Sequence, residues 1–73
     1  MSPPPLRPGG KPARLLLRLW SEQARGVRDV VVTFTPARLR LLDLGYVVPG
    51  HSHWAIKLTE AGRAAARALE AGS

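Results

Sequence analysis

The stretch LGYVVPGHSHWAIKLTEAGR, residues 44–63, decides the fold. Its two β-prone segments, YVV and WAIKL, flank a loop that contains Pro-Gly, and this pattern predicts a β-hairpin. In the second segment, alternation with period two puts Trp54, Ile56 and Leu58 on one face. Thr59 then follows as an N-cap residue. The stretch therefore predicts a hairpin that leads directly into a helix.

Helices are predicted on both sides of this hairpin. The C-terminal helix has an apolar stripe that consists of Ala61, Ala64, Ala65, Ala68 and Leu69. On the N-terminal side, a short helix begins at Pro36, with Thr35 as its N-cap, and ends before Gly45. Within it, we expect Leu39 and Leu42 to face the core because they lie three positions apart.

The remaining N-terminal part adds one helix and one strand. Residues 12–24 are predicted to be helical. The apolar face of this helix is formed by Leu15, Leu16, Leu19 and Trp20. Residues 29–35, DVVVTFT, favour a strand, with a short helix as the alternative. The side chains expected on one face of this strand are Val30, Val32 and Phe34.

A length of 73 residues allows a single domain. We expect this domain in residues 11–73, with the order α-β-α-β-β-α and therefore an α+β fold. Residues 1–10, which include SPPPLRPGG, are expected to form a disordered, basic, proline-rich arm. The chain has no cysteine, so disulfides and thiolate chemistry are excluded. No segment has the pattern of a signal peptide or a membrane span, so we expect a cytoplasmic protein.

Positive charge is concentrated near the N-terminus. The net charge is +6, and residues 1–18 carry four basic and no acidic side chains, against seven basic and five acidic ones in the remainder. The four are Arg7, Lys11, Arg14 and Arg18. A basic segment of this kind attracts phosphate backbones, and added salt weakens the attraction. Nucleic acid is therefore a candidate partner. The alternative is that the charge only makes the protein soluble.

The segment RLRLLDLGYVV…WAIKLTEAGRAAARALE, residues 38–70, resembles the second half of winged-helix transcription regulators of the MarR and PadR kind. In those families a recognition helix ends in a leucine, a glycine and a "-YV" strand, and a wing and an "LTeaGR" helix start follow. The resemblance implies a small winged-helix-like domain in which Arg38 and Arg40 lie on the DNA-reading helix. Because little sequence separates Trp20 from this helix, the helix-turn-helix is expected to be shortened.

The same resemblance assigns the hairpin a role. It implies that His51, Ser52 and His53 form the wing tip, near a phosphate backbone or a minor groove, and that Lys57 contacts phosphate. By themselves, two histidines with no third ligand nearby do not make a metal site. No cofactor or metal is therefore expected.

Two functions remain open at this point. The first is a DNA-binding transcriptional regulator that uses a basic arm, a short recognition helix and a wing, as a homodimer or in a larger complex. The second is a small protein-binding module, for example a phage-type regulator that docks on host RNA polymerase and alters transcription. An enzyme is not expected, because no catalytic arrangement stands out. Trp20 and Trp54 are expected in the core, with base stacking by Trp54 and anchoring of a partner by Trp20 as the alternatives.

Overall fold

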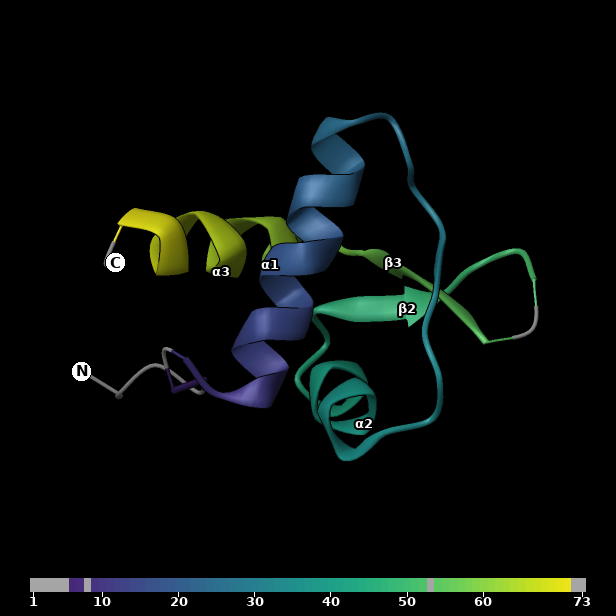
Figure 1. The fold of residues 1–73 in the computed structure, drawn as a ribbon, viewed down its shortest axis with the longest axis horizontal. Helices are drawn as coiled ribbons and strands as arrows, with labels where there is room; N and C mark the ends of the chain where they lie inside the picture. Colours follow the sequence, from purple (N-terminus) through teal and green to yellow (C-terminus); the bar gives the residue numbers. More distant parts are fainter. Residues whose placement is uncertain (1–5, 8, 53, 72–73) are drawn as a thin grey trace.

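The computed structural model describes residues 6–7, 9–52 and 54–71. Along the chain the elements follow the order α1, β1, α2, β2, β3 and α3 (Figure 1). They span Lys11–Ala24 (α1), Val30–Val31 (β1), Pro36–Asp43 (α2), Val47–Pro49 (β2), Ala55–Leu58 (β3) and Glu60–Ala71 (α3). The predicted order α-β-α-β-β-α is confirmed, and the fold class is α+β.

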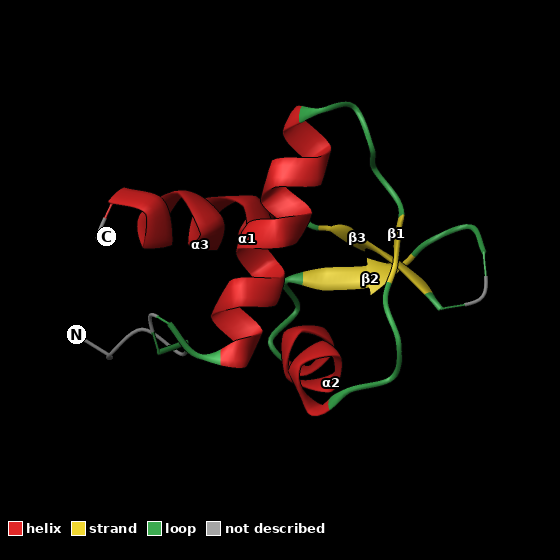
Figure 2. Cartoon of the chain, in the orientation of Figure 1, coloured by secondary structure: helices red, strands yellow, loops and turns green. Residues whose placement is uncertain are grey.

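The three strands form one antiparallel sheet in the order β1-β3-β2 (Figure 2). The register pairs Val30 with Ile56 and Val47 with Leu58. Because partners across a ladder share a face, these four side chains lie on one side of the sheet, and all four are buried. The opposite side carries Val31, Val48 and Lys57, which are exposed.

The helices complete the core on the buried side of the sheet. Helix α1 packs against both α2 and α3, and contributes the fully buried Leu16 and Leu19. Leu41 from α2 and Ala66 from α3 are buried in the same cluster. Leu6 also belongs to it, with 5% of its surface exposed. The folded unit therefore begins before residue 11, the boundary that the sequence suggested; residues 1–5 and 8 of the expected arm lie outside the described residues.

The LTEAG segment forms the joint between β3 and α3. The Thr59 hydroxyl accepts a hydrogen bond from the Gly62 backbone at 3.1 Å, as an N-cap does, and donates to the Gly45 carbonyl at 2.7 Å. The Thr59 backbone N–H donates to the Tyr46 carbonyl at 3.0 Å. A Cβ at Gly62 would clash with that same carbonyl oxygen. Glycine at position 62 therefore lets α3 lie directly on the backbone before β2.

The apolar stripe that the sequence predicted for α3 is wrong in part. The buried residues of the helix are Gly62 and Ala66, and Ala65 and Leu69 pack against the core beside them. The alanines that are exposed instead are Ala61, Ala64 and Ala68. The helix is rotated because Gly62, the residue without a side chain, makes the closest approach.

Three further side chains were expected in the core but are exposed. Phe34 is 61% exposed; the alternation of buried and exposed residues continues through Val32 and Thr33 and ends at Phe34, beyond β1. Leu39 is 46% exposed; the face of α2 that packs inward runs through Leu41, which is fully buried. Trp54 is 42% exposed, since its backbone φ of 70° takes it out of the strand conformation.

Candidate functional site

A groove lies between the starts of α1 and α2, beside the segment that joins β1 to α2. We call it the α1–α2 groove; its volume is about 720 Å³. It is lined by Lys11, Pro12, Leu15, Arg18, Val32, Thr33, Thr35, Pro36, Ala37 and Arg40. Among these described residues three are cationic and none is acidic. The groove therefore combines an apolar surface with three positively charged side chains.

Helix geometry explains how the three cations meet. Lys11 and Arg18 are seven positions apart, two turns of α1, so they lie on the same side of the helix. Arg14 stands between them at spacings of three and four, and is also exposed. Arg40 comes from α2, which Thr35 caps by accepting a hydrogen bond from the Arg38 backbone at 3.3 Å. The tertiary structure thus joins the predicted basic segment of α1 to one of the two predicted arginines of α2.

The two predicted arginines of α2 have different surroundings. Arg40 is exposed and lines the groove. The guanidinium carbon of Arg38 lies 5.1 Å from the centre of the Trp54 ring, a cation–π distance. The Arg38 Nε is buried, with no hydrogen-bond partner among the described residues. Arg38 is thus packed on the hairpin rather than extended from the helix surface.

Phe34 and Trp54 form an exposed aromatic pair. Their ring centres are 6.0 Å apart with an interplanar angle of 79°, an edge-to-face arrangement. The chain neighbours of Phe34 on both sides, Thr33 and Thr35, line the α1–α2 groove. The pair is therefore linked to the groove through segment 33–35, although neither ring is among the residues that line it. The sequence contains no clear signal for this exposure, because both rings fit the alternation of a strand.

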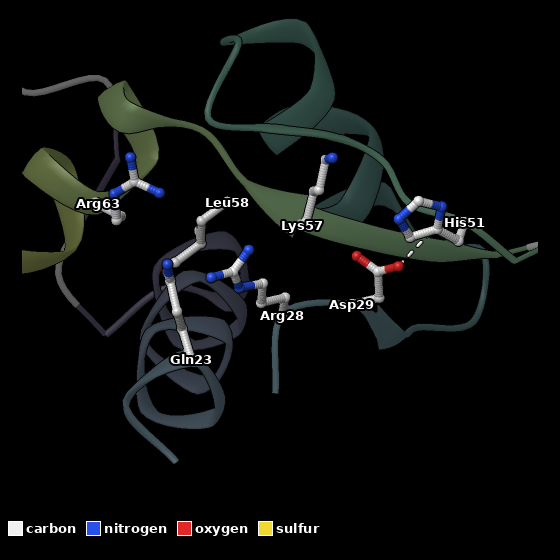
Figure 3. Close-up of a pocket in the computed structure, with 7 residues that line it drawn as sticks. All are labelled: Gln23, Arg28, Asp29, His51, Lys57, Leu58 and Arg63. Atoms are coloured by element: carbon white, nitrogen blue, oxygen red, sulfur yellow. Dashed lines mark hydrogen bonds between the residues drawn. The ribbon is translucent and has the colours of Figure 1, made fainter. Parts of the chain in front are cut away.

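A second hollow, of about 430 Å³, lies where the end of α1, the start of β1, β3 and α3 meet. It is lined by Gln23, Arg28, Asp29, His51, Lys57, Leu58 and Arg63 (Figure 3). Lys57 lies between Arg63 and His51 in that view. Two expected site residues, His51 and Lys57, are thus joined by two arginines that the sequence reasoning did not select. We call this the β3 hollow.

An acidic residue distinguishes the β3 hollow from the groove. The Asp29 carboxylate accepts a hydrogen bond from the His51 backbone at 3.0 Å and so ties the hairpin loop to the start of β1. Gly50 lies so close that an added Cβ would stand 2.9 Å from the Asp29 carboxyl carbon. The charge of the hollow is therefore partly balanced, and its acid holds the loop in place.

The other expected site residues are spread over the surface. Ser52 is exposed at the hairpin tip, and its carbonyl accepts a hydrogen bond from Ala55 at 3.0 Å. His53 lies outside the described residues. Arg7 is exposed just before α1 and is not one of the residues that line the groove.

Several alternative features are missing from the part of the chain that the structure describes. Residues 25–35, all of them described, contain β1 and loop but no helix, so no middle helix separates α1 from α2. No group of three or more His, Cys, Asp or Glu side chains in the described ranges could hold a metal ion. No helix formed by described residues is long and apolar enough to cross a membrane.

Fold and site together define a small α+β domain with a cationic groove between its first two helices. Comparison of the chain with protein-family models, with curated proteins and with solved structures finds no match.

Proposed function

We propose that the protein is a nucleic-acid-binding transcriptional regulator with a winged-helix-like architecture. The observation that carries the proposal is the α1–α2 groove, which gathers Lys11, Arg18 and Arg40 without an acidic residue among its described lining. Phosphate contacts of this kind supply most of the affinity in sequence-independent binding. Arg14 and Arg7 are also exposed, and they lie close to Lys11 in the sequence.

The order of the elements supports the architecture. A helix of eight residues is followed by a two-stranded hairpin and a C-terminal helix, as in the second half of a winged helix. His51, Ser52, His53 and Lys57 would then contact the phosphate backbone from the hairpin. With a short α2 and Arg38 packed on Trp54, the proposed binding mode depends more on phosphate contacts than on the reading of bases.

Salt dependence and charge removal test this function. For random-sequence nucleic acid, the logarithm of the binding constant should fall linearly with the logarithm of the salt concentration. Each of the variants Lys11→Ala, Arg18→Ala and Arg40→Ala should reduce the steepness of this line by about 0.7–0.9. Arg25→Ala is the matched control; it removes the same charge from a residue that pairs with Glu22 at 3.0 Å and does not line the groove. Equal effects from Arg25→Ala and the groove variants would contradict the proposal, as would an absence of binding at low salt.

A second function, protein docking, is favoured by a different observation. Val31 and Leu39 are 63% and 46% exposed, which is high for large apolar residues of a strand and a helix. In this case the protein would be a small module that docks on transcription machinery such as RNA polymerase. If this second function is correct, the protein should capture purified RNA polymerase, and the capture should not depend on salt. The Val31→Ser and Leu39→Ser variants should lose it.

A further inference from the structure

We infer that the nucleic acid bound by this protein is single-stranded, with its phosphates along the α1–α2 groove and unpaired bases stacked on Phe34 and Trp54. The inference rests on the proposed function and specifies its ligand. Proteins that bind single strands combine a positive groove, which follows the backbone, with aromatic side chains that stack on bases. Both parts are present here, and segment 33–35 connects them.

The exposed aromatic rings are the first part of the argument. Phe34 is 61% exposed and Trp54 is 42% exposed, in a domain whose sequence contains only four aromatic residues of the Phe, Trp and Tyr types. A small domain gains stability by burying such side chains, at about 25 cal/mol for each Å² of apolar surface. Their exposure therefore favours a role at the surface rather than in the core.

The backbone at Trp54 gives a second, independent indication. A φ of 70° is uncommon for a bulky residue and strains the backbone. Strained positions of this kind gather at binding sites. The edge contact with Phe34 and the guanidinium of Arg38 over the ring then hold the indole in one orientation. Such preorganisation lowers the entropic cost of binding a base.

The path of the ligand follows from the contacts around Phe34. Thr33 and Thr35 line the groove on either side of it, and Arg40 lines the same groove. Neither ring lines the groove itself, so a strand whose phosphates lie against Lys11, Arg18 and Arg40 would cross segment 33–35 to reach the aromatic pair. Bases in a duplex are stacked and paired, so only an unpaired strand can present a base face to these rings.

The decisive experiment compares strand states on the intact chain. Fluorescence anisotropy would measure binding of a labelled oligo-dT strand and of a labelled hairpin duplex of matched length, at about 50 and 200 mM salt. We expect the single strand to bind at least about fivefold more tightly. Phe34→Ala should lower single-strand affinity by at least about fivefold, the effect of losing one stacked base, and Phe34→Trp should restore it. Val27→Ala, another exposed apolar residue at 40%, is the control and should leave binding unchanged.

Intrinsic fluorescence gives a direct reading of stacking. The chain contains two tryptophans, so in a Trp20→Phe background the emission comes from Trp54 alone. Addition of oligo-dT should quench this emission, whereas the duplex should leave it nearly unchanged. Circular dichroism melts of each variant would establish that it is folded.

The possible results distinguish the inference from the proposed function. A single-strand preference that depends on Phe34 supports the inference. Equal affinity for duplex and single strand, or a Phe34→Ala variant that binds like the wild type, overturns the inference and leaves the phosphate-binding groove standing. No binding of either form at low salt overturns both the inference and the proposed function. A Phe34 dependence seen only in capture of RNA polymerase would reassign the aromatic pair to a protein partner and overturn the inference.

Discussion

The two tryptophans of this protein have similar partners and different surroundings. Trp20 lies under the guanidinium of Arg67 at 5.7 Å, and Trp54 lies under that of Arg38 at 5.1 Å. Trp20 also packs against the core, and its indole N–H donates to the Glu70 carboxylate at 2.9 Å. Trp54 stays 42% exposed on the hairpin, at a positive φ. In the Trp20 region, the arginine–tryptophan pair therefore joins α1 to α3. In the Trp54 region, the paired ring remains partly exposed.

The difference comes from what covers each ring. Trp20 lies on the apolar side of α1, and α3 passes over that side with Arg67 and Glu70 facing it. Trp54 contacts Phe34, which follows β1, and Arg38 of α2, and it remains 42% exposed. We therefore expect substitutions in the Trp20 region to change stability and substitutions in the Trp54 region to change binding.

The largest effect is expected from Gly62→Ala, which would displace α3 from the Trp20 region. In a helix, replacement of glycine by alanine normally stabilises by about 1 kcal/mol. Here the new Cβ would clash with the Tyr46 carbonyl, a backbone atom that cannot move aside. We expect a loss of about 3 kcal/mol in the free energy of unfolding, measured by urea denaturation. A gain in stability would show that α3 does not lie on this carbonyl.

Trp20→Ala should have the next largest effect. It removes a half-buried ring and its hydrogen bond to Glu70, so we expect a loss of about 2 kcal/mol in unfolding free energy. Nucleic-acid affinity, measured below the melting temperature by anisotropy, should not change. A folded Trp20→Ala variant that binds poorly would remove the distinction between the two regions.

Trp54→Gly should give the opposite result. Glycine adopts a φ of 70° without strain, which offsets part of the lost ring contacts, so the unfolding free energy should fall by no more than about 1 kcal/mol. Single-strand affinity should fall by about fivefold or more, in line with the loss of one stacking partner. Paired urea melts and anisotropy titrations measure both. A large loss of stability with unchanged affinity would assign Trp54 to the core.

The smallest effects concern the two arginines. Arg67→Gln and Arg38→Gln each remove one cation–π contact at a partly exposed ring, so each should cost about 0.5 kcal/mol of unfolding free energy. Only Arg38→Gln should also weaken single-strand binding, because it loosens the orientation of Trp54. Thermal melts and anisotropy on the two variants provide a matched comparison. Equal changes in affinity would indicate a general charge effect.

Local signals in the sequence determined most of the elements. Thr35 and Pro36 define the start of α2, Thr59 caps α3, and the order α-β-α-β-β-α is confirmed. These signals succeed because caps and turns depend on the hydrogen bonds of a few neighbouring residues. The positive charge of the segment that includes Lys11 and Arg18 was also evident, since charge is a property of composition.

Only the tertiary structure decided which side chains are covered and which basic residues meet. The rotation of α3 depends on the contact between Gly62 and the backbone of Tyr46, which comes from a different part of the chain. Arg40 reaches the groove of Lys11 and Arg18 because α2 packs on α1. Phe34 and Trp54 fit the alternation of buried strand residues, yet they are exposed, Phe34 beyond the end of β1 and Trp54 at a positive φ. Periodicity along one segment predicted the buried faces of α1 and β3, but burial also depends on contacts between distant segments, which periodicity does not show.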